Sequence, residues 1–457
     1  MPVSNDRGPI GESYEHLQSL PELRQARECF EVPPASPESI VRTVLQSAEL
    51  AMINLHDLTS RASSDLRNQA RGGAVVKLSW AQGFHRLLVA LSLVPQYTVA
   101  LFEAGRPVSA PGLKRSPAYR GLRYAIRRFD RTFLNCTDLA EIERTIAGSS
   151  LDAAEYRFVQ LVRACSFEAS IWERNLYTLP AWREVSRHDD YIGAGWLRQA
   201  ATGLCLSGDT YFMQFRALHQ IPELLAMECS DHIAAAVTLN RCSDLASVAA
   251  HLMAANYLLE IIVSAGTVMA DHLATSDYHA IRENLGLTSG SHSMAIRYQL
   301  FQNAYSELAE QVEQRRQKDA TAALGRLIDG ELRRFRCYMG LWREMHMQLP
   351  RNNLGGNATR SLIGAADAVE AVRQMRTEAQ WRDPLREAAE LNSMHGPGQP
   401  PLTRYFASEA SLDTHLLAVT GGITQKRFSN VQNRTGYFEA RPQPVLPTTQ
   451  KRVVAVM

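Results

Sequence analysis

Apolar residues recur at three- and four-residue spacing along most of the first 350 positions, with polar residues between them. This spacing places the apolar side chains on one face of an α-helix. The alternation typical of β-strands is almost absent. The pattern predicts an all-α fold whose main helices cover residues 38–62, 75–103, 153–176, 232–271, 293–315 and 320–348.

Proline and glycine cluster in three segments, at 105–117, 350–356 and 396–401. Both residue types interrupt helices, so these clusters predict loops. Beyond about residue 428 the chain becomes polar and rich in proline, which is typical of an extended or disordered segment. Residues 428–457 are therefore expected to form a tail.

Short matches indicate an internal repeat. Glu49-Leu50-Ala51-Met52 resembles Glu223-Leu224-Leu225-Ala226-Met227, with start positions that differ by 174. Two further matches share an offset of 170: Ala125-Ile126-Arg127 with Ala295-Ile296-Arg297, and Trp172 plus Leu179-Pro180 with Trp342 plus Leu349-Pro350. The alternative is that any two amphipathic helices look alike. A true repeat divides the chain into residues 1–180 and 185–427.

The composition excludes several classes of protein. The chain has 457 residues, 45% of them hydrophobic, which is enough for a large core. Its 49 basic and 47 acidic residues leave a net charge of +2, so charge gives no argument for a nucleic-acid or membrane partner. No apolar run reaches the roughly 18–20 residues of a membrane span, and the N-terminus lacks the order of a signal peptide. We expect a cytoplasmic protein.

The cysteines point the same way. There are seven of them, scattered, and none forms a Cys-x-x-Cys motif. They therefore indicate neither a disulfide framework nor a zinc ribbon. We expect them to be reduced and mostly buried.

Three segments carry residues with possible chemistry. His219 shares a helix face with the glutamate four residues on, which by itself is typical of a surface hydrogen bond. Arg297 follows a helix start that Ser291 or Ser293 could cap, and a guanidinium there can bind a carboxylate through two hydrogen bonds. His346 ends a helix before a loop rich in Pro, Gly and Asn, where a neutral imidazole can bind iron.

Together and in order, these segments resemble the tryptophan 2,3-dioxygenase superfamily. The family's His-Gln-x-x-Glu-Leu, Ser-Gly-x-x-Ser-x-x-x-Arg and Trp-Arg-x-x-His patterns are matched at residues 219–224, 289–297 and 342–346. Upstream, Asp190-Tyr191-Ile192 and Trp196-Leu197-Arg198-Gln199 resemble the segment that opens the family's catalytic core. The resemblance covers about residues 188–375.

The resemblance implies a helical bundle of the tryptophan/indoleamine 2,3-dioxygenase type that binds haem b. His346 would be the axial ligand of the haem iron, and His219 would be the catalytic residue that faces the substrate ring. The implied substrate-binding residues are Arg297, Thr359, Ser291 and Tyr191. Residues 185–427 would be the haem-binding catalytic domain. Leu176 and Leu45 stand where His346 and His219 would fall in the first copy, which predicts a degenerate first half without a haem ligand.

The chain also departs from the family pattern. Thr359 lies in a loop that replaces the family's Gly-Thr-Gly-Gly-Ser, and Ser291 occupies a position that is aromatic in the family. Pro222, Leu225 and Ala226 replace aromatic residues after the His-Gln pair. The expected pocket is therefore less aromatic than that of the family, and the substrate need not be tryptophan itself.

The resemblance implies an oxygenase that uses dioxygen to dioxygenate the ring of a tryptophan-like amino acid or indole derivative. A monooxygenase that hydroxylates an aromatic amino acid and a non-catalytic helical scaffold or sensor are the alternatives. The expected partners are a small aromatic substrate and dioxygen. The first half would replace a neighbouring subunit, which makes each chain a pseudo-dimer with one haem and the assembly a dimer of pseudo-dimers. A non-haem metal site at His188 and Asp189 lacks an obvious further ligand.

Overall fold

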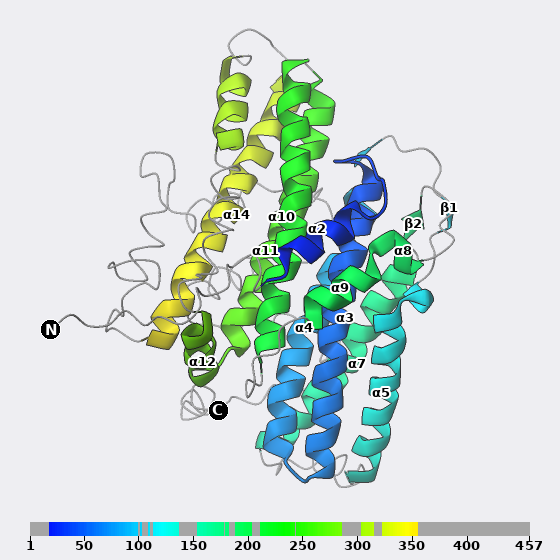
Figure 1. Ribbon diagram of the computed structural model, residues 1–457. Helices are drawn as coiled ribbons and strands as arrows, with labels where there is room; N and C mark the ends of the chain where they lie inside the picture. The colour runs from blue at the N-terminus through cyan, green and yellow to red at the C-terminus, as the bar shows by residue number, and fades with distance from the viewer. Residues whose placement is uncertain are drawn as a thin grey trace, which may run out of the picture.

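The computed structural model describes residues 18–98, 101–102, 108–109, 113–136, 153–177, 179–181, 188–202, 211–242, 244–285, 303–314 and 322–354. Nearly all of these residues are helical. The strands in this part of the chain are β1 (Val108–Ser109) and β2 (Pro180–Ala181), which pair antiparallel. The prediction of an all-α fold is confirmed here. Figure 1 shows two helical bundles that extend in opposite directions from a shared centre.

The first bundle consists of α3 (Pro37–Arg67), α4 (Arg71–Thr98), α5 (Pro117–Cys136) and α7 (Ala153–Tyr177). α3 packs against α4 and α5, and α4 packs against α7. Trp80, Phe84 and Trp172 are almost fully buried in its interior. Three of the predicted helices are thereby confirmed, because the apolar stripe of each one covers the stripes of its neighbours.

The second bundle consists of α10 (Phe212–Arg241), α11 (Leu245–His272), the helix at residues 303–314 and α14 (Ala322–Leu354). The prediction of one helix over residues 232–271 is wrong, because the chain turns between α10 and α11. Asp244 caps α11 by accepting a hydrogen bond from the backbone N–H of Ser247 (3.2 Å). An N-cap aspartate marks the start of a new helix, which the apolar period alone does not show.

The prediction of a loop at residues 350–356 is wrong up to residue 354, because α14 continues through Pro350 to Leu354. Leu349 is buried in the main core, and Asn353 Nδ2 donates to the carbonyl oxygen of Leu349 (2.8 Å). This burial offsets the backbone hydrogen bond that the proline removes. The expected loop at 396–401 and the expected tail at 428–457 lie outside the described residues.

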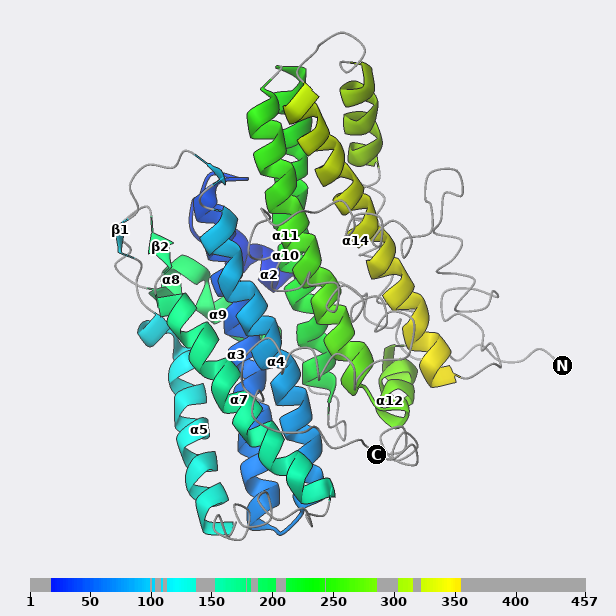
Figure 2. The ribbon, with the colours of Figure 1, turned by 180° about the vertical axis from the view of Figure 1, so that it is seen from behind.

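Short helices join the two bundles. They are α2 (Leu20–Glu28), α8 (His188–Ile192), α9 (Ala194–Thr202) and α12 (Thr275–Leu285). α2 packs against α9, α9 also packs against α3, and α12 packs against α14. Figure 2 shows α2 and α9 near the centre, where the bundles meet.

The helices of the two halves recur at one offset in residue number. Adding 174 to the bounds of α4 gives 245 and 272, the bounds of α11, and adding 174 to those of α2 gives 194 and 202, the bounds of α9. The same shift takes α3 to 211–241, one residue longer than α10. Leu23-Arg24-Gln25-Ala26 in α2 also recurs as Leu197-Arg198-Gln199-Ala200 in α9.

The contacts between the halves follow the same offset. Gln46 Nε2 on α3 donates to the carbonyl oxygens of Ala26 (2.7 Å) and Ile192 (3.1 Å). Its counterpart at that offset, Gln220 on α10, donates to Ala200 (2.8 Å) and Gln18 (3.0 Å). Each carbonyl in the second pair is the counterpart of one in the first. Each glutamine thus bonds one carbonyl of its own half and one of the other, as a local two-fold axis requires.

α11 is the central helix of the molecule. By length and composition it is long and apolar enough to cross a membrane, so the prediction that no apolar run reaches the length of a membrane span is wrong. Of its most apolar 18 residues, 94% are buried inside the protein, against α10, α4 and α14. A helix that is apolar on all sides is what such a central position requires.

Candidate functional site

His219 lies on α10 and is buried. Its Nδ1 is 2.8 Å from the carbonyl oxygen of Phe215, and the two rings are 4.3 Å apart. Burial lowers the pKa of His219 to about 4, despite the opposing effect of the bond to Phe215. The imidazole is therefore neutral near pH 7. Donation from Nδ1 makes Nε2 its acceptor nitrogen.

The interpretation of His219 and Glu223 as a surface hydrogen bond is wrong, since both side chains are buried. Residues Gln220 and Glu223 of the histidine motif also have counterparts in the first half, Gln46 and Glu49. Gln46 and Gln220 have the same structural task of joining the halves. His219 is therefore the residue of this motif that the repeat does not explain.

The contacts of α10 place His219 along α11. Cys229 Sγ on α10 donates to the carbonyl oxygen of Ala255 on α11 (3.7 Å), so these two residues lie at the same height along the paired helices. His219 is ten residues before Cys229, and the two helices are antiparallel. Counting ten residues forward from Ala255 puts His219 at the level of Ala265 on α11.

His346 lies within α14, which runs parallel to α11; the side chain of His346 lies outside the described residues. Tyr338 Oη donates to Glu260 Oε2 (2.9 Å) and sets the level of these two helices. His346 is eight residues further along, at the level of Val268. At a rise of about 1.5 Å per residue, the levels of the two histidines differ by about 5 Å along α11.

Of the four predicted substrate-binding residues, Tyr191 alone lies within the described part of the chain. Arg297, Ser291 and Thr359 lie outside the described residues. Tyr191 is buried on α8, where its ring lies edge to face with Phe30 at 5.2 Å. α8 packs against α3, so the contacts of Tyr191 are with the first half.

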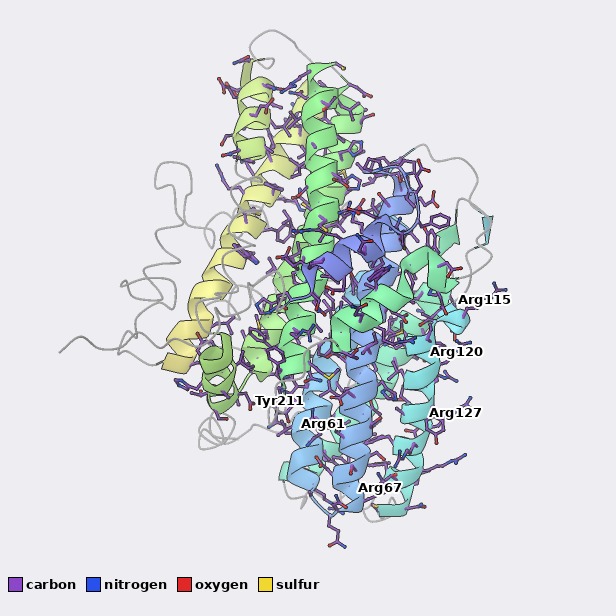
Figure 3. The ribbon with its side chains drawn as sticks, in the orientation of Figure 1. Arg61, Arg67, Arg115, Arg120, Arg127 and Tyr211 are labelled. Carbon is purple, nitrogen blue, oxygen red and sulfur yellow. The ribbon has the colours of Figure 1, made fainter. Side chains whose placement is uncertain are left out.

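The first half lacks both histidines of the expected site and keeps the arginine. Leu176, the counterpart of His346, is buried in the first bundle. Arg127, the counterpart of Arg297, is exposed on α5 and points away from the bundle (Figure 3). The histidine in this core is His85, which accepts a hydrogen bond from Trp172 Nε1 (3.0 Å) and whose pKa burial lowers to about 3.

A buried polar cluster that the sequence reasoning missed surrounds Glu228 on α10. Glu228 accepts hydrogen bonds from Ser39 Oγ and Thr43 Oγ1 (3.2 Å) on α3 and pairs with Arg27 on α2 (3.1 Å). Burial alone would raise the pKa of Glu228, but the hydrogen bond and charge of His232, together with Arg27 and Ser39, bring it below its usual value. Glu228 is therefore a charged link between the halves.

The cluster continues through two histidines. His232 Nε2 lies 3.4 Å from Glu228 Oε1, and its Nδ1 lies 2.9 Å from Nδ1 of His251 on α11. The contact with Glu228 is an ion pair when His232 is protonated, and the two Nδ1 atoms form a hydrogen bond in which one ring donates and the other accepts. The counterparts of Glu228, His232 and His251 in the first half are Asn54, Leu58 and Lys77. The carboxylate and the two histidines therefore occur in the second half alone. The four-residue spacing of Glu228 and His232 was the available sequence signal.

A second missed feature is a stack across the seam between the halves. Arg61 on α3 lies over the ring of Tyr211 (5.5 Å), and Tyr211 stacks on Trp80 of α4 (5.5 Å). His272 on α11 lies on Trp80 as well (5.5 Å). Figure 3 shows Arg61 and Tyr211 together near the centre of the molecule. The first half thus supplies side chains next to the start of α10.

No group of three or more His, Cys, Asp or Glu side chains that could hold a metal ion occurs within the described part of the chain. Comparison with protein-family models, curated proteins and solved structures gave no match.

Proposed function

We propose that the chain is a haem-dependent oxygenase that uses dioxygen on an aromatic amino acid or indole derivative, with dioxygenation of the ring as the reaction. The observation that carries the proposal is the ordered set of His219, Arg297 and His346. Its support in the structure is a neutral, buried His219 at nearly the same level along α11 as the backbone of His346. α12, which leads into the segment containing Arg297, packs against α14.

Each residue would have a separate role. Haem b, when bound, supplies the iron that takes up dioxygen. His346 would ligate that iron. His219 would accept a hydrogen bond from a ring N–H or hydroxyl of the substrate and so orient the ring. The amino-acid group of the substrate would be held by Arg297, Thr359, Ser291 and Tyr191.

The surroundings of His219 fit this role. The ring of Phe215 lies beside it on α10 and stacks in turn on the ring of Phe212, an apolar setting that suits a planar ligand. With a pKa of about 4, His219 keeps its acceptor nitrogen at neutral pH and loses it as the pH falls through about 4. Substrate orientation by His219 should therefore be insensitive to pH between about 6 and 8.

We further propose that the first half stands in for a neighbouring subunit. The recurrence of helix bounds at one offset and the equivalent contacts of Gln46 and Gln220 support this reading. The first half also contributes Arg27, Arg61 and Trp80 to the seam beside α10. One haem per chain follows, because the first half has Leu176 and Leu45 at the two histidine positions.

Haem content tests the proposal most directly. The purified protein should show a Soret band that shifts on reduction and CO addition, with one haem per chain. His346→Ala should lose this band, whereas His279→Ala, at an exposed position on α12, should keep it. His219→Ala should keep the haem and lose turnover. Full haem content in His346→Ala would remove the central assignment.

Labelled dioxygen separates the two reactions. Two labelled atoms in the product mean dioxygenation of the ring. One labelled atom means that the enzyme is instead a haem-dependent monooxygenase that hydroxylates its aromatic substrate.

A non-catalytic scaffold or sensor is the second candidate function. The observation that favours it is the structural role of Gln220, which accounts for part of the histidine motif without catalysis. A protein that binds no haem after reconstitution, or binds it without consuming dioxygen in the presence of aromatic amino acids, would support this candidate over the oxygenase.

A further inference from the structure

The outer face of α5 carries three arginines and a tyrosine in a straight row. Arg120, Tyr124, Arg127 and Arg131 are four, three and four residues apart, so at about 100° per residue they lie within about 60° of one another around the helix. All four are exposed, Tyr124 by 69%. Figure 3 shows Arg120 and Arg127 projecting away from the bundle. We call these four residues the basic row.

The arginine side chains of the basic row have no ion pair, hydrogen bond or ring contact with any residue that the structure describes. On one flank, Arg123 is paired with Glu173 of α7 (3.1 Å). The one acidic residue of α5, Asp130, lies about 80° around the helix from Arg120. The basic row is therefore a line of positive charge whose guanidinium donors are available to another molecule.

Tyr124 distinguishes one class of anionic partner from the others. Its exposed ring lies between arginines, where a nucleobase can stack on it, and such stacking is a main contribution to the binding of single-stranded nucleic acid. α5 contains arginine and no lysine, and a planar guanidinium both binds phosphate through two hydrogen bonds and stacks on bases. The row is about 16 Å long, which matches about five nucleotides of a stacked strand at about 3.4 Å each.

Other anionic partners fit this face less well. A helix binds an anionic membrane by inserting its apolar face, and the apolar face of α5, with Leu122, Ala125 and Phe129, is buried in the first bundle. A protein interface has an apolar centre. The large exposed apolar side chains of α5 are Tyr124 and Leu134, which are ten residues apart and form no such centre.

We propose that the basic row binds single-stranded nucleic acid, with its arginines on backbone phosphates and Tyr124 stacked on a base. The net charge of +2 for the whole chain gives no argument for such a partner. The fold provides the argument, because it places five arginines and one acidic residue on a single surface helix. The contact lies on the first bundle, so it does not depend on haem binding or on catalysis.

Fluorescence anisotropy of the full chain with labelled oligouridine and oligothymidine tests this contact and separates RNA from DNA. The logarithm of the binding constant should fall with the logarithm of the salt concentration with a slope of about −2, or about −0.7 for each of three arginines. Arg127→Gln/Arg131→Gln should weaken binding about tenfold or more and remove about 1.4 from the size of this slope.

The matched control is Arg198→Gln/Arg326→Gln, which removes the same charge at exposed positions of α9 and α14. It should change affinity less than about twofold, because these positions lie outside the phosphate contacts. Circular dichroism verifies that each variant is folded. An equal loss in the control would mean that net charge alone holds the strand, and it would overturn the proposal.

Substitutions of Tyr124 test the stacking. Tyr124→Ala should weaken binding about fivefold or more, and Tyr124→Phe should keep it, because stacking needs the ring and not the hydroxyl. A duplex of the same length should bind more weakly, since its paired bases are not free to stack on Tyr124.

Three results would overturn the proposal. The first is a wild-type chain that binds neither oligonucleotide in about 50 mM salt, where electrostatic binding is strong. The second is a poly-glutamate peptide that binds as tightly as the oligonucleotides, because the row would then recognise charge alone. The third is an Arg127→Gln/Arg131→Gln variant that loses binding to phosphatidylserine vesicles and keeps binding to the oligonucleotides, because the row would then be a membrane surface.

Discussion

The two glutamines that join the halves give the sharpest test of the repeat. Gln46→Ala and Gln220→Ala each remove two hydrogen bonds between a buried amide and backbone carbonyls. Each hydrogen bond contributes about 1 kcal/mol, and the small cavity left by truncation costs about 1 kcal/mol more. Each variant should therefore lose about 2–3 kcal/mol of unfolding free energy, and the two losses should be similar.

Urea unfolding followed by circular dichroism measures both losses. The matched controls are Gln25→Ala and Gln199→Ala, which change exposed glutamines on α2 and α9 and should alter stability by less than about 0.5 kcal/mol. If Gln220→Ala is costly while Gln46→Ala behaves like the controls, the two contacts are not equivalent. The two halves would then contribute unequally to the stability of the contact between them, which would contradict the local two-fold axis.

Three further predictions follow from the buried charges and the proposed site. Glu228→Gln should cost about 2–3 kcal/mol at pH 7 because Arg27 loses its buried partner. This loss should shrink as the pH falls below 4.5 in urea unfolding, since a depressed pKa gives stability only above the unfolded value. Buried His85 stays unprotonated down to about pH 3, whereas the unfolded chain takes up that proton near pH 6.5, so the wild type should lose about 1.4 kcal/mol of stability per pH unit between these values. His85→Leu should not show this loss. An unchanged pH profile in the variant would contradict this. Arg297→Leu should raise KM for an amino-acid substrate about 10- to 100-fold in steady-state kinetics, and unchanged KM would mean that no carboxylate binds there.

Several elements could be predicted from the chain because their signals are local. The apolar period of about 3.6 residues gave α3, α4 and α7 within a few residues. Of the three short matches, the one at residues 49–52 has the 174-residue offset at which the helix bounds recur, and the other two differ by 170. The apolar period did not show the break between α10 and α11, whereas the largely polar run at 240–244, which ends in the capping Asp244, marks it. Pro350 predicted the end of a helix, but α14 continues to Leu354. The burial of Leu349 outweighs the backbone hydrogen bond that Pro350 cannot donate.

The candidate site divides in the same way. His219 is proposed as a site residue from its motif alone. The interpretation that it forms a surface hydrogen bond with Glu223 is wrong, because the spacing of residues on a helix does not show which face becomes buried. Glu228 and His232 are four residues apart on α10, which was the local signal, but their partners lie on α2, α3 and α11, so no spacing along the sequence indicates the whole cluster. Tyr191 packs against the first half, and its role in substrate binding stays a prediction.

The sequence alone determined the helical class of the protein and most helix positions, because the apolar period and helix caps act over a few residues. Tertiary structure decided which faces meet. Packing buries His219 and thereby lowers its pKa. It also brings Gln46 and Gln220 to equivalent positions, where each bonds one carbonyl of its own half and one of the other. The arginines of α5 and the glutamates of 303–314 lie on different bundles, although the chain as a whole is nearly neutral. Burial and charge proximity depend on residues that are distant in sequence, and only packing brings those residues together.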